Sequence, residues 1–302
     1  MSKFRFHIRN FVLLSTVFAF SSFVDAQATR TWVSGVGDDV NPCSRTAPCK
    51  TFAGAISKTA TNGEINCLDP AGYGAVTITK SITIDCEDTQ GSILASLTNG
   101  VIINITAATD TKKAVKLRGL SINGSGNGVN GVRILAANSV NLEQVVIDGF
   151  GTHGVSVETT SGAVKVSVDD CSIRSNTGNG INTFIIGGQV FLDISRTRLN
   201  NNATGLNLSS NTKATISQSM VNSNTTGLLA ANASLGVQNC VVSNNTTGIT
   251  ASTGGTVRIM GNMITNNGTG LSVSGGSLVS FVSNIFSGNT TDGSPSSTSP
   301  LQ

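Results

Sequence analysis

The sequence predicts an all-β protein: a right-handed, single-stranded parallel β-helix, a solenoid of about 10 coils with a short N-terminal capping helix. Three observations carry this prediction. Apolar residues recur every 21 to 26 residues, in the column Ile122, Ile147, Ile173, Leu199, Val221, Val242, Ile264 and Ile285. Two more apolar columns stand five and seven residues before these positions, with mostly polar residues between them. A Gly followed by an aliphatic residue also opens a segment in each repeat, at Gly131, Gly154, Gly180, Gly205, Gly227, Gly248 and Gly270.

Apolar residues two positions apart are typical of a strand with one buried and one exposed face. With the segment that each Gly opens, a repeat holds about three short strands and leaves no room for a helix. Asn-rich turns such as Asn244-Asn245 precede the Gly, and stacked Asn side chains can bond from coil to coil. The period is irregular, which argues against the left-handed type with its strict hexapeptide repeat.

Composition excludes several classes. The 302 residues are 38% hydrophobic and 12% charged, so the chain is neither disordered nor a coiled coil. Its two His exclude a His-rich metal site.

Residues 1–26 have the layout of a secretory signal peptide. A basic start (Lys3, Arg5, Arg9) precedes an apolar stretch and the small-residue cleavage signal Val24-Asp25-Ala26. We therefore expect a secreted or periplasmic protein that does not insert into a membrane after cleavage. Removal of the leader leaves 16 of the 19 basic and 15 of the 16 acidic residues. This near-neutral balance argues against nucleic acid as a partner.

The ends of a β-helix expose strand edges that must be covered. We expect residues 27–63 to form an N-terminal loop and capping helix, with residues 51–59 helical and Phe52, Ala55 and Ile56 on one face. The β-helix should occupy residues 64–288 and begin with strands at 64–68, 75–79 and 81–86. Residues 289–302 are Ser, Thr, Pro and Gly-rich, and we expect a flexible tail.

Four of the six cysteines lie close together near the N-terminus. In an oxidising compartment they indicate two disulfides, and of three possible connectivities we favour Cys43–Cys49 and Cys67–Cys86. Cys171 and Cys240 fall at inward positions about 14 Å apart, three coils at the usual strand spacing. That separation is too large for a disulfide, so we expect two buried free thiols.

One outward column carries the candidate site. It contains Arg118, Glu143 and Asp169 in successive coils, with Lys116 and Asp193 beside it. One interpretation is a groove of the polysaccharide-lyase kind, in which carboxylates hold Ca²⁺ and Arg or Lys removes a proton. The other is a ladder of opposite charges on a solvated face. We favour the ladder because every carboxylate here has a basic neighbour. The sequence gives no metal-ligand set and no catalytic residue.

Two segments resemble known proteins. Residues 31–74 resemble the opening segment of many secreted bacterial β-helix proteins, on the stretches VSGVGDDVNP at 33–42 and PCKTFAGAI at 48–56. The repeats from residue 115 onward resemble those of the pectin-lyase-like superfamily. The resemblance covers nearly the whole chain after the leader and implies the fold. Members with known activity mostly cleave, epimerise or bind polysaccharides.

The catalytic motifs of that superfamily are broken here. Polygalacturonase-type hydrolases present N-T-D, D-D, G-H-G and R-I-K in that order, whereas His153 precedes Asp169-Asp170 and two motifs are missing. We read His153 as a turn residue.

Two functional hypotheses follow. The first is a secreted, non-catalytic β-helix protein that binds a polysaccharide or cell-surface glycan, or serves in extracellular interaction, and needs no cofactor. The second is a polysaccharide lyase or related carbohydrate-active enzyme that acts on an acidic polymer with Lys116, Arg118, Glu143 and Asp169. Ca²⁺ would be required only under the second. We favour the first because no intact catalytic set is present.

Overall fold

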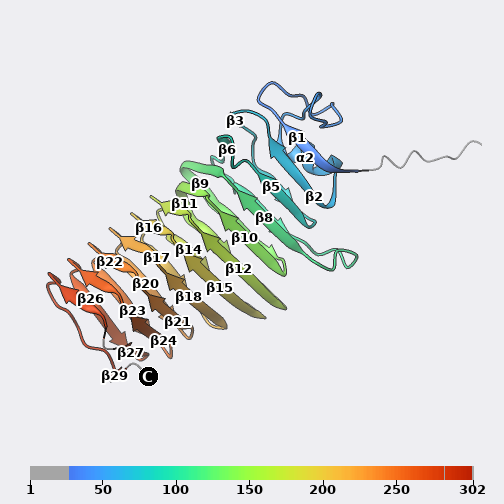
Figure 1. Ribbon diagram of the computed structural model, residues 1–302. Coiled ribbons are helices and arrows are strands. Elements are labelled where there is room, and N and C mark those ends of the chain that lie inside the picture. The colour runs from blue at the N-terminus through green and yellow to red at the C-terminus, as the bar shows by residue number, and fades with distance from the viewer. Residues whose placement is uncertain (1–26, 282, 301–302) are drawn as a thin grey trace, which may run out of the picture.

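The computed structural model describes residues 27–281 and 283–300, and Figure 1 shows them as a parallel β-solenoid of about 10 turns. The predicted fold class is confirmed: the protein is all-β and only 3% helical. The predicted signal peptide, residues 1–26, lies outside the described residues.

Each turn adds strands to three rows, and every strand runs parallel to its neighbours within a row. Row 1 is a 12-stranded sheet of β1 (Ala28–Val33), β2 (Thr59–Cys67), β5 (Ile82–Asp85), β8 (Ala114–Arg118), β10 (Ser139–Glu143), β12 (Ala163–Asp169), β15 (Gln189–Ser195), β18 (Thr212–Ser217), β21 (Ser234–Gln238), β24 (Thr256–Met260), β27 (Ser277–Phe281) and β29 (Ser297–Ser299). Row 2 holds short strands, β3 (Ala71–Gly72), β6 (Gly91–Leu94), β13 (Ser172–Arg174), β16 (Arg198–Asn200), β19 (Met220–Asn222), β22 (Val241–Ser243), β25 (Met263–Thr265) and β28 (Ile285–Ser287). Row 3 holds β4 (Val76–Ile78), β7 (Val101–Asn104), β14 (Asn179–Thr183), β17 (Thr204–Leu208), β20 (Thr226–Ala231), β23 (Thr247–Ser252) and β26 (Thr269–Ser274). Two long strands, β9 (Leu120–Ala136) and β11 (Val146–Val157), pass through rows 2 and 3.

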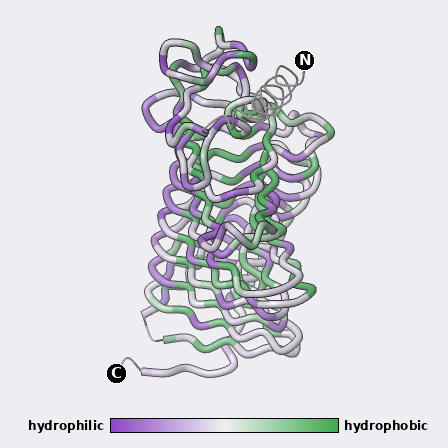
Figure 2. Tube along the Cα trace, turned by 90° about the vertical axis from the view of Figure 1, so that its right-hand side faces the viewer, coloured by the Kyte–Doolittle hydropathy of each residue, from purple (hydrophilic) through white to green (hydrophobic). Residues whose placement is uncertain are grey.

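The core consists of the apolar columns that the sequence predicts. Val115, Val140 and Val166 are register partners in row 1, and all three are buried. Burial alternates along each row 1 strand, so the intervening side chains point outward. Figure 2 shows the hydrophobic segments recurring from turn to turn along the stack. Stacking like residues at strand spacing excludes water from the interior without any helix in the coils.

A buried asparagine ladder fixes the corner between rows 2 and 3. Its members follow a residue of positive φ, and each backbone N–H donates to the Oδ1 of the next member, along Asn176, Asn202, Asn224, Asn245, Asn267 and Asn289. The ladder satisfies backbone donors that no strand partner reaches at a corner. The expected coil-to-coil bonding of Asn is therefore confirmed.

The recurring glycine of each repeat is a site of close approach between coils. A Cβ at Gly227 would lie 2.5 Å from the carbonyl oxygen of Gly248, and Gly205 and Gly248 stand in the same relation to the next coil. Only a residue without a Cβ fits here, which explains why the sequence returns to Gly once per turn.

Helix α2 (Phe52–Lys58) covers the N-terminal end, as predicted. The Thr51 hydroxyl caps it by accepting from the Gly54 N–H at 2.9 Å, and Phe52 and Ala55 are fully buried on the core side. Asp39 anchors the preceding loop by accepting from the backbone N–H of Lys50 and the hydroxyl of Thr51.

The expected boundaries need two corrections. The segment 27–63 contains strand β1 as well as the loop and helix, and β2 begins at Thr59 rather than at 64. The expected tail returns to the sheet, because β29 pairs with β27 and the Ser296 N–H donates to the Leu278 carbonyl. Unpaired backbone at a sheet edge gains hydrogen bonds by such pairing, which composition alone does not reveal.

The cysteines pair as favoured. Cys43–Cys49 has a Cα–Cα distance of 4.6 Å, and Cys67–Cys86 joins the ends of neighbouring strands at 4.9 Å. Cys171 and Cys240 are free and buried. No helix in the described part of the chain is long and apolar enough to cross a bilayer.

Candidate functional site

The structure brings Lys116, Arg118 and Glu143 together on the outward face of row 1. Glu143 is the register partner of Arg118, and its carboxylate lies 2.8 Å from Lys116 Nζ and 3.5 Å from Arg118 Nε. Arg118 also contacts Asp85 at 3.5 Å and Glu87 at 2.7 Å. Two cations therefore face three carboxylates in one compact cluster.

Asp169 is the next residue in the Glu143 column, but it has partners of its own. Its carboxylate accepts from the Ser195 hydroxyl at 2.5 Å and pairs with Arg196. Asp193 lies three strands from Lys116 and accepts from the Thr215 hydroxyl at 2.5 Å. Asp193 thus belongs to a different part of the row, and the five predicted residues do not form one site.

We name the cluster of Asp85, Glu87, Lys116, Arg118, Glu143 and Asp169, with Arg196, the charge ladder. Half-exposed ion pairs of this kind contribute little to stability, but they neutralise one another. In the described residues no group of three or more His, Cys, Asp and Glu is arranged to hold a metal ion.

A groove of about 640 Å³ lies farther along the same outward face. We name it the Phe191 groove, and the residues that define it are Lys165, Phe191, Asp193, Lys213, Gly236 and Arg258. It crosses β10, β12, β15, β18, β21 and β24, so its long direction follows the stack rather than one strand.

An aromatic ring and two lysines stand in one column of this groove. Lys165, Phe191 and Lys213 are successive register partners, and Phe191 is 37% exposed. Lys213 Nζ lies 5.9 Å from the centre of the Phe191 ring, within reach of a cation–π interaction. The groove therefore offers a ring face and a charged donor side by side.

The cations of the Phe191 groove lack acidic partners. None of Lys165, Lys213 and Arg258 forms an ion pair with a carboxylate among the described residues, whereas Lys116, Arg118 and Arg196 all do. Arg258 reaches back toward the groove, with Nη1 3.5 Å from the Ser234 hydroxyl.

The floor of the groove is deepened by a missing side chain. At Gly236 a Cβ would meet only the Thr215 methyl group, 3.7 Å away. The groove is thus hollowed between Lys213 and Arg258, and its net charge is positive because Asp193 is its single carboxylate.

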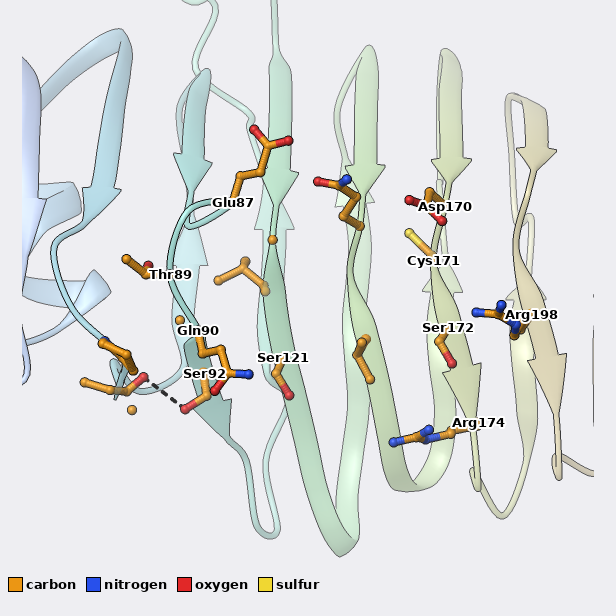
Figure 3. A pocket seen from close by; sticks show the side chains of 18 residues that line it. Glu87, Thr89, Gln90, Ser92, Ser121, Asp170, Cys171, Ser172, Arg174 and Arg198 are labelled. Carbon is orange, nitrogen blue, oxygen red and sulfur yellow. Dashed lines mark hydrogen bonds between the residues drawn. The ribbon is translucent and has the colours of Figure 1, made fainter.

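A second hollow, of about 980 Å³, lies over row 2 and the corner before it (Figure 3). Arg174 and Arg198 project into it beside Ser172, and Glu87 stands on the loop at its opposite side. Arg174 is bound to Asp148 at 3.2 Å and Glu87 to Arg118. Cys171 lines this hollow but is only 3% exposed, and burial raises its thiol pKa to about 12, so it is no nucleophile.

The expected turn at His153 is wrong: His153 lies within strand β11 and pairs with Asn130 of β9, because the chain keeps its strand pairing past the register irregularity after Phe150. The His153 Nδ1 accepts from the Asn179 backbone N–H at 3.1 Å. Burial lowers the pKa of its imidazole, against the opposing charge of Glu158. Both the accepting Nδ1 and the lowered pKa favour the neutral imidazole of His153 in the folded protein.

Solved structures share this fold. Pectate lyase Pel9A superposes with a TM-score of 0.64 and 14% identity, over 89% of this chain and 79% of its own. Tailspike protein 2 of an Escherichia coli O157:H7 bacteriophage gives 0.61 and 13% over 92% of this chain, which spans 42% of that protein. A xylose complex of XylC gives 0.57 and 9%, over 85% of this chain and 69% of its own. The protein has the right-handed β-helix fold of these proteins. At these identities the likeness concerns the fold alone. No curated protein sequence matches the chain.

Residues 193–301 match the family described as "Periplasmic copper-binding protein (NosD)". The residues of this segment do not fit a copper site. It has no His, and its one Cys, Cys240, is buried with a thiol pKa raised by burial to about 11. The exposed Met220 and Met263 are separated by Val241 in their column, about 10 Å apart at the usual strand spacing, too far to share an ion.

Sequence reasoning missed Lys165, Phe191, Lys213 and Arg258 as a group. The signal was present, because Lys165, Phe191 and Lys213 each stand eight residues before the repeat column that begins at Ile122. The outward column that lies two residues before the Lys116 column contains this aromatic ring between two lysines.

Proposed function

We propose that this protein is an extracytoplasmic, non-catalytic glycan-binding β-helix protein, and that an acidic polysaccharide binds in the Phe191 groove. The observation that carries the proposal is the presence of three unpaired cations around an exposed aromatic ring in a hollow that crosses six strands. Unpaired cations on a folded surface attract anionic partners, and they are concentrated here rather than at the charge ladder.

The groove chemistry suits a sugar polymer. The face of Phe191 can pack against the apolar face of a pyranose ring, while Lys165 and Lys213 on either side can bind carboxylate or sulfate groups. The cation–π contact of Lys213 is exposed and therefore weak, so the ammonium can leave the ring for a ligand anion at little cost. Asp193, Thr215 and Ser234 supply hydrogen-bonding groups along the floor.

Location outside the cytoplasm is supported by independent observations. The leader reads as a signal peptide, and two disulfides indicate an oxidising compartment. The family that matches residues 193–301 is described as periplasmic. Among the structural neighbours, a pectate lyase and a xylose complex indicate that this fold carries carbohydrate sites.

The lyase hypothesis retains one specific observation in its favour, the closeness of Lys116 and Arg118 to Glu143. Against it, each cation that would serve as a base is held by a carboxylate at 2.7 to 2.8 Å. If the hypothesis is right, Arg118→Ala abolishes turnover without changing the melting temperature.

The test uses the mature chain, residues 27–302, with acidic and neutral polysaccharides in the presence and absence of Ca²⁺. Binding is followed by co-sedimentation and calorimetry, and cleavage by unsaturated-sugar absorbance and new reducing ends. We expect binding to acidic polymers without turnover. Phe191→Ala and Lys213→Gln should each weaken binding about threefold or more.

Two variants serve as matched controls. Met220→Ala removes a comparably exposed apolar side chain from row 2, and Lys50→Gln removes an exposed lysine from the N-terminal end. Both should bind as the unmodified chain does. Turnover of any polymer, or equal loss of binding in the controls, contradicts the proposal.

A further inference from the structure

We propose that the Phe191 groove selects polymers that carry one anionic group on every second sugar residue. This inference rests on the proposed function and specifies the ligand of the same site. It follows from where the unpaired cations stand along the stack and from what occupies the strands between them.

The three cations lie on alternate strands. Lys165 is on β12, Lys213 on β18 and Arg258 on β24, and the register pairs place β15 and β21 between them. At about 4.8 Å per strand, neighbouring cations are separated by about 10 Å along the stack, and the whole array spans about 19 Å. Lys165 and Lys213 share the Phe191 column, whereas Arg258 stands in the adjacent outward column, that of Asp193 and Gly236. A pyranose residue in an extended chain advances the polymer by about one strand spacing, so the cations match every second residue.

The strands between the cations carry no positive charge. On β15, Phe191 and Asp193 point outward, and the Asp193 carboxylate would repel a negative group above it. On β21, the residues that line the groove are Ser234 and Gly236, which provide a hydroxyl and open space. A neutral sugar over β15 can pack on the Phe191 ring without electrostatic repulsion from the Asp193 carboxylate.

The array differs from the charge ladder in the pairing of its cations. Lys116 and Arg118 lie on the same strand, β8, with Glu143 on β10 holding both. Lys165, Lys213 and Arg258 lie on alternate strands and have no such partner among the described residues. The contrast within one row indicates that spacing, and not simply positive charge, distinguishes the Phe191 groove.

The test compares three ligands of equal length by calorimetry: a hyaluronan decasaccharide with one carboxylate per disaccharide, a polygalacturonate decasaccharide with one per residue, and carboxyl-reduced hyaluronan. We expect hyaluronan to bind at least as tightly as polygalacturonate although it carries half the charge, and the reduced, neutral ligand to bind at least threefold more weakly than hyaluronan.

Asp193→Asn separates spacing from total charge. Removing the repulsion at β15 should strengthen polygalacturonate binding about threefold and leave hyaluronan binding within error, whereas Lys213→Gln should weaken both. Circular dichroism melting of each variant verifies that the fold is intact.

Two results overturn the inference while glycan binding stands: tighter binding of polygalacturonate with no response to Asp193→Asn, or equal binding of the neutral ligand. If none of the three ligands binds but other acidic polymers do, the spacing inference also fails. If no polysaccharide binds at all, the proposed function itself fails.

Discussion

Asn224 and Asn245 occupy the same position in successive coils, and the Oδ1 of Asn245 accepts from both the backbone N–H and the Nδ2 of Asn224, at 2.9 and 3.0 Å. Asn224 Nδ2 also donates to the Leu199 carbonyl of the preceding coil at 3.0 Å. One buried side chain thus joins three coils at their corner.

Replacing Asn224 by Ala should destabilise the protein by about 2 to 4 kcal/mol, because the buried backbone N–H of Asn202 and the carbonyl of Leu199 in the preceding coil lose their partners. The measurement is the free energy of unfolding in urea. Asn222→Ala is the control, since its side chain lies on the outward face of the same coil. Equal effects of the two substitutions would contradict a structural role for the ladder.

Gly227→Ala should destabilise by about 1 to 3 kcal/mol, because the new methyl group would lie 2.5 Å from the Gly248 carbonyl oxygen and force the coils apart. Gly236→Ala is the matched control, with its nearest contact at 3.7 Å, and should change stability little. Thermal melting of both variants checks the pair. A Gly227→Ala variant as stable as Gly236→Ala would show that the coils can separate freely.

The free energy of unfolding should fall as pH decreases from 7.5 to 5.5. Burial lowers the pKa of His153 in the folded state, so the unfolded chain binds a proton first as pH falls through about 6.5. Protonation in the folded state would also remove the acceptor that His153 Nδ1 offers to Asn179. His153 is the only histidine after the leader, so His153→Asn should flatten this dependence. An unchanged slope in the variant would assign the effect to other groups.

Cys171 and Cys240 should resist thiol reagents in the folded protein. Both are buried, and burial raises their thiol pKa values to about 12 and about 11. A colorimetric thiol reagent at pH 8 should find almost no reactive thiol in the native state and two after unfolding in guanidinium without reductant. Rapid labelling of the native chain would place at least one of them at the surface. Four thiols after unfolding would contradict the two disulfides.

The repeat columns predicted most of the fold because a solenoid is built from contacts between like positions. Val115, Val140 and Val166 could be aligned by counting, and their stacking follows from strand spacing alone. The capping helix was predictable from Phe52, Ala55 and Ile56, since an apolar face at helical spacing is a local signal. The return of β29 to β27 was not, because pairing at a sheet edge is a long-range contact.

The candidate site was predicted only in part. Column counting placed Arg118, Glu143 and Asp169 correctly on one face, but it could not show that Glu87 reaches Arg118 from a corner loop or that Arg196 holds Asp169. Those contacts neutralise the charges of the Arg118, Glu143 and Asp169 column. Lys165 and Lys213, on the same row, have no such ion-pair partner among the described residues.

The sequence by itself determined the coil period, the inward columns, the disulfide-bearing N-terminal region and the glycines where coils touch. These features depend on spacing along the chain, which a repeat records directly. Only the tertiary structure decided which charges are paired and where a groove opens, as with Asp193 lying beside Thr215 and Phe191 rather than beside Lys116. Side-chain partners on neighbouring coils are chosen by reach and direction in space, and residue spacing alone does not encode either.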